Sequence, residues 1–371
     1  MPGKPGTRLQ DWLLRAAGIL VALGLISLVI LAMGISPLEA AQLIFSGVFA
    51  SSRLGYVMTA WVPVLLCSAG LLLTYNAGLW NIGIEGQIVM GAILTTGAIR
   101  LLQNALPPAA VLVLAALAGI LGGMLWAFLA GVLRLYGNIS EIFGGLGLNF
   151  IAGSLTVYLV LGPWKRPGIG STSGTEPFSP SLWLPAFPGF TVSPIEIFLG
   201  LLAIALIAMA LRGTYFGLRL KAIGKNLRSA FLLGVSTGRQ LLLAFAACGA
   251  LAGLAGWVLV VGASSRHQLF PLISSGYGFL AILVVLLANL SPVWTVPISF
   301  FFAAISMGSL QLSYRQLDSS LGGVIQGLLV LSVLVTQGLS RLWEQRVRAA
   351  APMGKRDRPH GASDPEPGDL P

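Results

Sequence analysis

The stretch Tyr75-Asn-Ala-Gly-Leu-Trp-Asn-Ile-Gly-Ile-Glu-Gly-Gln87 joins two long apolar runs of the chain. It contains four amide or carboxylate side chains and three glycines. A carboxylate at the centre of a membrane costs roughly 2.5–3.5 kcal/mol. Irregular polar backbone is tolerated at that depth only where it is buried in protein or lines a hydrated cavity. We therefore expect this stretch to border a solute path and not to face lipid.

The composition of the remaining chain is that of a membrane protein. Of the 371 residues, 56% are hydrophobic and 9% are charged, and the mean hydropathy is +0.87. A soluble domain carries about 25% charged residues. Both cysteines, Cys67 and Cys248, lie in apolar runs and are expected to be packing residues, with no disulfide framework and no metal site.

The apolar runs predict an all-α polytopic membrane protein with about ten transmembrane helices. A helix that crosses the hydrocarbon layer needs about 20 residues. The eighth run is short, which indicates a broken or partly buried helix and leaves counts of nine or eleven open. The predicted ranges are 13–33, 57–75, 82–102, 109–133, 142–162, 194–211, 240–262, 276–289, 293–312 and 320–340.

The distribution of Lys and Arg predicts the orientation. If the N-terminus lies inside, sixteen of the 22 basic residues fall in cytoplasmic segments, which the positive-inside rule favours. Both termini are therefore predicted to be cytoplasmic. Residues 1–12 form the N-terminal segment, 13–340 the transmembrane domain, and 341–371 a disordered tail. The net charge of +10 is attributed to topology and lipid, and not to nucleic acid.

The outer connection 162–193, rich in Pro, Gly and Ser, allows two interpretations. Its Trp164 and Trp183 are typical of an interfacial loop with aromatic anchors. The alternative is a docking surface for an external binding protein. His267, next to Arg266 near another outer loop, is expected to be a solvated histidine.

Small residues at a four-residue spacing predict close helix contacts. Three pairs of glycines within the predicted spans have this spacing, and the run Cys248–Gly256 is the densest. The pairs are Gly119/Gly123, Gly249/Gly253 and Gly323/Gly327.

The cytoplasmic connection 212–239 alternates basic and apolar residues, with a short helix expected at Ser229–Leu233. An interfacial helix that extends its Lys and Arg side chains to lipid phosphates explains this pattern. A helix that docks a cytosolic partner explains it equally well.

Four motifs in order resemble permeases of ABC importers in the branched-chain amino acid, ribose and nucleoside group. They are Gly78-Leu-Trp-Asn-Ile-Gly-Ile-Glu-Gly-Gln87, Ala222-Ile-Gly-Lys-Asn-Leu-Arg-Ser-Ala-Phe-Leu-Leu-Gly234, Gly249-Ala-Leu-Ala-Gly-Leu-Ala-Gly256 and Gly276-Tyr-Gly-Phe279. The resemblance covers roughly residues 57–340 and is strongest to the nucleoside and simple-sugar branch. The chain departs from the family at Leu280, where an Asp is usual, and at Leu227, where a Pro is usual.

The resemblance implies a transport subunit and not an enzyme. ATP is used by a separate cytosolic ABC ATPase, because the chain lacks a G-x-x-x-x-G-K-[ST] phosphate loop, and no cofactor is expected on this chain. The other implied partners are a second permease subunit, identical or homologous, an extracytoplasmic solute-binding protein and the bilayer of the inner or plasma membrane. The implied solute is a nucleoside, or next a simple sugar. The loop residues implied in coupling to the ATPase are Ala222, Gly224, Asn226, Ala230 and Gly234.

Amide side chains suit a path for a polar solute, because each has both donors and an acceptor. We predict Asn81, Gln87 and Asn149 to line this path. Asn76 and Asn289 are weaker candidates. The aromatic rings of Phe279, Trp80 and Phe150 allow two interpretations: core packing, which the sequence favours for each, or stacking on a nucleobase or sugar.

Glu85 has three interpretations: an ion pair that locks helices, a protonated group bonded to backbone carbonyls, or a contact with solute. An ion-coupled secondary transporter in which Glu85 carries the proton is the alternative function. An intramembrane enzyme is disfavoured because the sequence has no paired His or Asp cluster. Glu141, Glu196 and Asp318, near the ends of predicted spans, are expected to be helix caps or interfacial groups.

Overall fold

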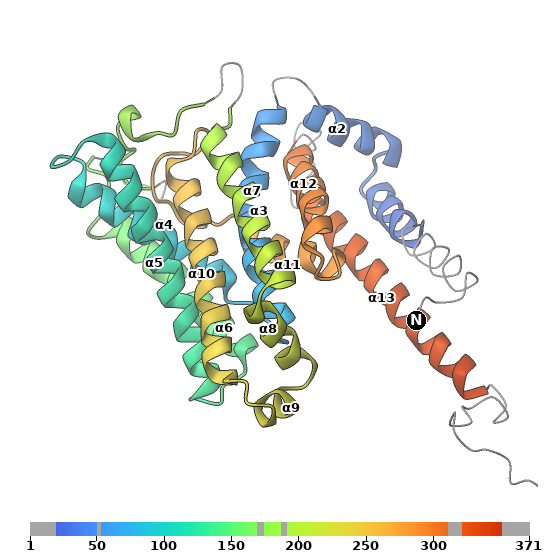
Figure 1. The fold of residues 1–371 in the computed structure, drawn as a ribbon. Coiled ribbons are helices and arrows are strands. Elements are labelled where there is room, and N and C mark those ends of the chain that lie inside the picture. Colours follow the sequence, from blue (N-terminus) through green and yellow to red (C-terminus); the bar gives the residue numbers. More distant parts are fainter. Residues whose placement is uncertain (1–19, 50–52, 169–173, 187–190, 311–320, 351–371) are drawn as a thin grey trace, which may run out of the picture. The chain divides into compact units, whose positions relative to one another are not determined.

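The computed structural model describes residues 20–49, 53–168, 174–186, 191–310 and 321–350 (Figure 1). Every regular element within these ranges is a helix. The chain divides into two compact units, one formed by residues 30–327 and the other by residues 1–29 and 328–371. In the described part of the smaller unit, residues 20–29 and 328–350 are helical.

The helices of the larger unit follow the predicted ranges closely. The connection between α7 and α10 contains two short helices, and α13 continues into the smaller unit. The elements are α2 (Pro37–Phe49), α3 (Leu54–Asn76), α4 (Ile84–Leu102), α5 (Pro108–Leu135), α6 (Glu141–Leu161), η1 (Pro180–Leu182), α7 (Pro194–Gly213), α8 (Tyr215–Lys225), α9 (Leu227–Leu232), α10 (Thr237–Val261), α11 (Tyr277–Leu287), α12 (Pro292–Ser309) and α13 (Leu321–Ala350).

Six of the described helices are long and apolar enough to cross a membrane: α3, α5, α6, α7, α10 and α12. A bent pair, Leu20–Ala32 and Pro37–Phe49, adds a seventh if it is counted as one span. The predicted short range 276–289 corresponds to α11, which has 11 residues. The chain is therefore a multi-pass, all-helical protein within the described residues.

One predicted boundary is wrong. The tail was expected to be disordered from residue 341, but α13 continues to Ala350. Residues 341–350 contain neither Gly nor Pro and are rich in Arg, Leu, Glu, Gln and Ala, which favour helix even without an apolar span. Residues 351–371, and 1–19 at the other end, lie outside the described residues.

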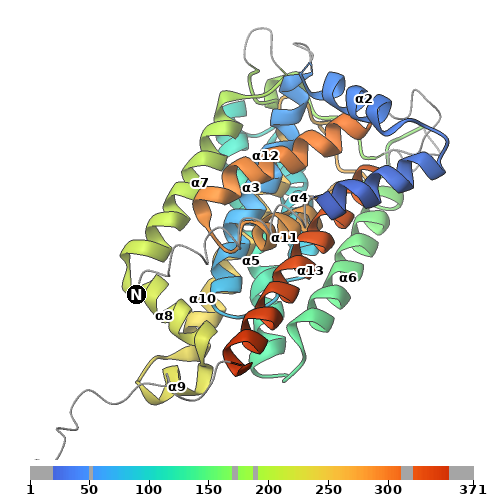
Figure 2. The ribbon, with the colours of Figure 1, turned by 90° about the vertical axis from the view of Figure 1, so that its right-hand side faces the viewer.

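The core of the larger unit is formed around α3 and α10. The most apolar window of α3 is 89% buried and that of α10 is 72% buried, whereas α5, α6 and α7 bury about a third or less. Contacts join α10 to α5, α4 and α3, and the views in Figures 1 and 2 show these helices side by side. The exposed apolar faces of α5, α6 and α7 suit contact with lipid chains.

Glycines allow α4, α5 and α10 to approach at backbone distance. A Cβ atom added to Gly123 would lie 2.6 Å from the Cα of Gly253, and one added to Gly91 would lie 2.5 Å from the same atom. The close contacts predicted for Gly119/Gly123 and Gly249/Gly253 are confirmed. Cβ atoms added to Gly323 and Gly327 would meet no described atom within 4 Å, so the contact of that pair stays a prediction.

Replacing Gly123 with Val should destabilise the protein, because the added methyl groups would push α5 away from α10. Overpacking of this kind costs about 1–3 kcal/mol or more. The measurement is the thermal unfolding midpoint in detergent. Gly153→Val on α6 is the matched control, because Gly153 has open space around it. Equal midpoints for the two variants would contradict the assigned α5–α10 contact.

The connection 162–193 packs against the segment that links α10 to α11. The Thr175 N–H donates to the Leu269 carbonyl (2.8 Å) and the Phe178 N–H donates to the His267 carbonyl (2.8 Å). The indole of Trp183 stacks on the His267 ring, with centroids 3.9 Å apart. The described part of this connection is therefore anchored to protein.

The prediction of a solvated His267 is wrong. Its side chain is only 7% exposed, and its Nδ1 lies 3.0 Å from the Ser265 hydroxyl. Trp183, which covers the His267 ring, is distant in the sequence. Its apolar contact could therefore not be inferred from the neighbouring Arg266. Burial lowers the pKa of His267 from 6.5 to about 4.

This pKa predicts a pH dependence of stability. At pH values between about 6.5 and about 4, the unfolded chain binds a proton at His267 that the folded protein does not bind. The free energy of unfolding should therefore fall as the pH is lowered through that window. Thermal midpoints at about pH 7.5 and about pH 5 measure the loss. His267→Gln should reduce the difference between the two, and an unchanged difference would show that other groups cause it.

Candidate functional site around the Asn76–Gln87 segment

The segment between α3 and α4 is a compact turn. The side-chain amide of Asn76 donates to the Leu72 carbonyl (2.7 Å). The Gly78 N–H donates to the Tyr75 carbonyl (3.0 Å) and the Leu79 N–H to the Thr74 carbonyl (2.9 Å). Gly78 has φ +77°, a left-handed conformation that favours glycine at the end of a helix. The polar groups that end α3 are thus satisfied locally.

Asn81 and Gln87 form a reciprocal amide pair. The Asn81 Nδ2 donates to Gln87 Oε1 (3.1 Å), and the Gln87 Nε2 donates to Asn81 Oδ1 (2.9 Å). The Asn81 Nδ2 also lies 3.2 Å from the Cys248 Sγ on α10. Both amides are buried, at 1% and 0% exposure. In this conformation their hydrogen-bonding groups are directed at protein, and the predicted lining of a path by these two residues stays a prediction.

Asn149 connects α6 to the start of α4. Its Nδ2 donates to the Ile82 carbonyl (3.0 Å), and its Oδ1 accepts from the Gly86 N–H (2.8 Å). The backbones of α6 and of the segment are also close at Gly145, where an added Cβ atom would lie 2.6 Å from the Gly83 nitrogen. Asn149 is half-buried, so one side remains accessible.

Glu85 holds the N-terminus of α11. Its Oε1 accepts from the Gly276 N–H (2.9 Å) and its Oε2 accepts from the Gly278 N–H (2.8 Å). A carboxylate at this end of a helix satisfies unpaired N–H groups and complements the helix dipole. This is a structural hydrogen-bonding role, as the sequence favoured, but its partners are backbone N–H groups and not the cation or carbonyls considered from the sequence. A contact of Glu85 with solute stays a prediction. The sequence signal that was missed is the Gly-Tyr-Gly motif, whose backbone offers donors.

The remaining candidates are dispersed. Phe279 and Trp80 are each 45% exposed. Trp80 belongs to the segment, and Phe279 follows Gly278, whose N–H donates to Glu85. Phe150 is 76% exposed on α6. Asn289 is exposed in the turn between α11 and α12, with φ +49°. The structure therefore brings Asn76, Asn81, Glu85, Gln87 and Asn149 to one region and leaves Asn289 outside it.

The predicted coupling loop contains two helices in place of one. The Asn226 Oδ1 accepts from the Ser229 N–H (2.9 Å), so it caps α9 (Leu227–Leu232). The predicted helix at Ser229–Leu233 begins two residues too late because this cap was not recognised. Ala230 is buried, and Gly234 has φ +81°. Gly224, in the last turn of α8, packs against the backbone of Asn76, a contact that the sequence did not predict.

Two other acidic residues form local interactions at helix ends. Glu141 pairs with Arg134 (3.0 Å), and Glu196 accepts from the Ala263 N–H (2.7 Å). Asp318 lies outside the described residues. No group of three or more His, Cys, Asp or Glu side chains suited to a metal occurs among the described residues.

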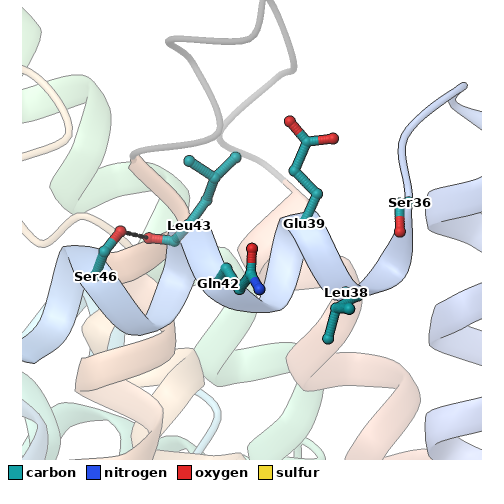
Figure 3. Close-up of a pocket in the computed structure, with 6 residues that line it drawn as sticks. All are labelled: Ser36, Leu38, Glu39, Gln42, Leu43 and Ser46. Carbon is teal, nitrogen blue, oxygen red and sulfur yellow. Dashed lines mark hydrogen bonds between the residues drawn. The ribbon is translucent and has the colours of Figure 1, made fainter.

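A separate hollow of about 580 Å³ lies along α2 (Figure 3). In the close-up, Glu39 points away from the helix, and the Ser46 hydroxyl donates to the Leu43 carbonyl (2.9 Å). The hollow is lined by one helix and its N-terminal flank and contains none of the predicted path residues. Its lining residues are Ser36, Leu38, Glu39, Gln42, Leu43 and Ser46.

Comparison with known proteins identifies the family. Residues 53–334 match the model of the permease component of branched-chain amino acid transport systems. The chain belongs to this permease family. This match confirms the family predicted from the four motifs. Permeases of this family are membrane transport components and not enzymes.

Several curated relatives of this permease carry transport names. It is 30% identical over 336 residues to a glucose ABC transporter permease protein of Haloferax volcanii, which covers 87% of each chain. It is 24% identical to a nucleoside ABC transporter permease protein of Lactococcus lactis, over 76% of this chain and 79% of the relative. A guanosine ABC transporter permease protein of Bacillus subtilis is also 24% identical, over 88% and 94%.

Replacing Glu85 with Ala should destabilise the permease more than replacing it with Gln. Ala leaves two partly buried N–H groups without an acceptor, at about 1–3 kcal/mol each. Gln keeps one acceptor oxygen and nearly the same volume. Thermal unfolding of both variants in detergent measures the difference. If Glu85→Ala were as stable as wild type, the carboxylate would not hold α11.

Proposed function

We propose that this permease is one of two membrane subunits of an ATP-driven importer for a nucleoside or, next, a simple sugar. The family match and the transport names of the relatives support this assignment. Paired relatives named as nucleoside permease proteins of Lactococcus lactis support a second, homologous or identical permease subunit. A cytosolic ABC ATPase supplies the energy, and an extracytoplasmic binding protein delivers the solute. No cofactor is proposed on this chain.

We further propose ten membrane crossings with both termini in the cytoplasm. The six long helices, the first helix (Leu20–Ala32), α4, α11 and α13 together supply ten. The helices α4 and α11 fall outside the six because one carries the polar segment and the other is short. Such interrupted helices are tolerated at membrane depth where protein surrounds them. An even number of crossings places both termini on the same side of the inner or plasma membrane. The basic residues favour the cytoplasmic side.

The observation that carries the proposed coupling is the exposed apolar end of the cytoplasmic loop. Phe231, Leu232 and Leu233 are 65%, 76% and 83% exposed, and Arg228 lies three residues before Phe231 in the chain. Ala230 is buried beneath, so α9 presents a defined face. Exposed apolar residues rimmed by polar ones are typical of a protein contact. We place the ATPase subunit on this face.

The proposed solute path borders the accessible members of the predicted set. Asn149 is half-buried and Phe279 is 45% exposed, so an amide and a ring are available to a solute. Asn81 and Gln87 enter the path only in a conformation in which their mutual hydrogen bonds open. Asn76 is proposed to act at the same end through its position in the turn.

Reconstitution tests the function directly. The purified permease, its partner permease, the cognate ATPase and the binding protein are placed in liposomes, and uptake of labelled nucleosides and sugars is measured. Uptake should require ATP on the ATPase side and should survive a protonophore. Uptake driven by a proton gradient without ATPase would instead support the ion-coupled alternative with Glu85.

Phe231→Glu should abolish or strongly reduce co-purification of the ATPase, because it places a charge in the proposed apolar contact. The matched control is Tyr136→Glu, which changes another exposed aromatic residue, at 78% exposure, just beyond the end of α5. The measurement is the ratio of ATPase to permease after affinity purification. Equal ratios in wild type and Phe231→Glu would remove the ATPase from this face.

A further inference from the structure

The coupling loop meets the Asn76–Gln87 segment at backbone distance. A Cβ atom added to Gly224, in the last turn of α8, would collide with the Asn76 carbonyl oxygen and lie 3.1 Å from the Gly78 nitrogen. A Cβ added to Gly78 would lie 3.2 Å from the Gly224 Cα. Neither glycine has a side chain that would separate the two segments at this point. A displacement of α8 here cannot be absorbed by a change of rotamer.

The other turns of α8 are held firmly. Lys221 donates from Nζ to the Leu211 carbonyl at the end of α7 (2.7 Å). A Cβ on Gly217 would lie 2.6 Å from the Leu211 Cα, so α7 and α8 also meet at backbone distance. Leu220 and Ile223 are buried. Figure 1 shows α8 beside the ends of α3 and α10, with which it makes contacts. The turns of α8 that precede Gly224 therefore have fixed contacts with α7.

The Asn76–Gln87 segment has partners on three other helices. Asn81 contacts Cys248 of α10. Asn149 of α6 hydrogen-bonds to Ile82 and Gly86, which lie on either side of Gly83. Glu85 bonds the N-terminus of α11. Of these partners, α11 follows irregular backbone, in which Leu272, Ser275 and Gly276 have positive φ. Its start is thus joined to a non-helical segment on one side and to Glu85 on the other.

We propose that Gly224 and Gly78 form the contact through which movement of the coupling loop is passed to the Asn76–Gln87 segment, and through Glu85 to the start of α11. Both glycines are positioning residues for transport, and neither contacts solute. The inference rests on the proposed function, in which the α8–α9 loop binds the ATPase. Close-packed backbone transmits displacement because it has no void to take it up.

The first test uses Gly224→Ala in the complete transporter with its ATPase and binding protein. The added methyl group separates α8 from the turn, while the exposed face of α9 is unchanged. We expect normal ATPase co-purification and continued ATP hydrolysis, with roughly 2- to 30-fold less solute moved per ATP, the range found for changes along coupling networks. Gly238→Ala, in the first turn of α10 with open space around it, is the matched control and should behave as wild type.

Solute moved per ATP that is unchanged in Gly224→Ala would overturn the proposal. Co-purification separates this failure from failure of the proposed function. A wild-type permease that does not bind the ATPase, or that transports without ATP, refutes the function itself and the transmission with it.

A second measurement covers a variant that does not assemble. Hydrogen exchange of the wild-type transporter is compared with and without trapped nucleotide. The proposal expects exchange to change in residues 215–234, in 76–87 and in 274–280 together. A change confined to 215–234 would overturn it.

Discussion

The polar connection between α3 and α4 is possible only because protein groups satisfy it from every side. It lies between helices whose surroundings are apolar, and water cannot be relied on to pair its amides and carboxylate. Three side chains join this connection to three other helices: Asn81 contacts α10, Glu85 bonds the start of α11, and Asn149 bonds it from α6. The need to satisfy one short segment thus determines how four helices meet.

The glycine contacts complete this arrangement by a different physical route. Lipid chains are as apolar as leucine, so burial of apolar surface does little to hold membrane helices together. Close backbone approach increases dispersion contacts instead. At Gly123 and Gly253 this joins α5 to α10, and at Gly224 and Gly78 it joins α8 to the polar segment. The same kind of contact packs two long helices in one place and joins a short helix to the polar segment in the other.

The candidate site shows how far residue type alone can be interpreted. The sequence singled out a segment whose polar side chains lie close together in the structure, because amides and a carboxylate between apolar runs are costly. It did not identify their partners. Glu85 was expected to meet a cation, a carbonyl or a solute, yet it accepts two backbone N–H groups, which have no signature in side-chain chemistry. His267 was expected in solvent, but Trp183 from a distant connection covers it.

By itself the sequence determined the class of protein, the approximate helices and the family, because hydropathy, charge distribution and ordered motifs are local properties of the chain. It also determined that α11 would be short. Only the tertiary structure decided that Asn81 and Gln87 pair with each other, that Glu85 holds α11, and that Gly224 rests on the turn at Gly78. Those contacts join residues 6 to 193 positions apart, and which partners meet is decided by the packing of helix against helix.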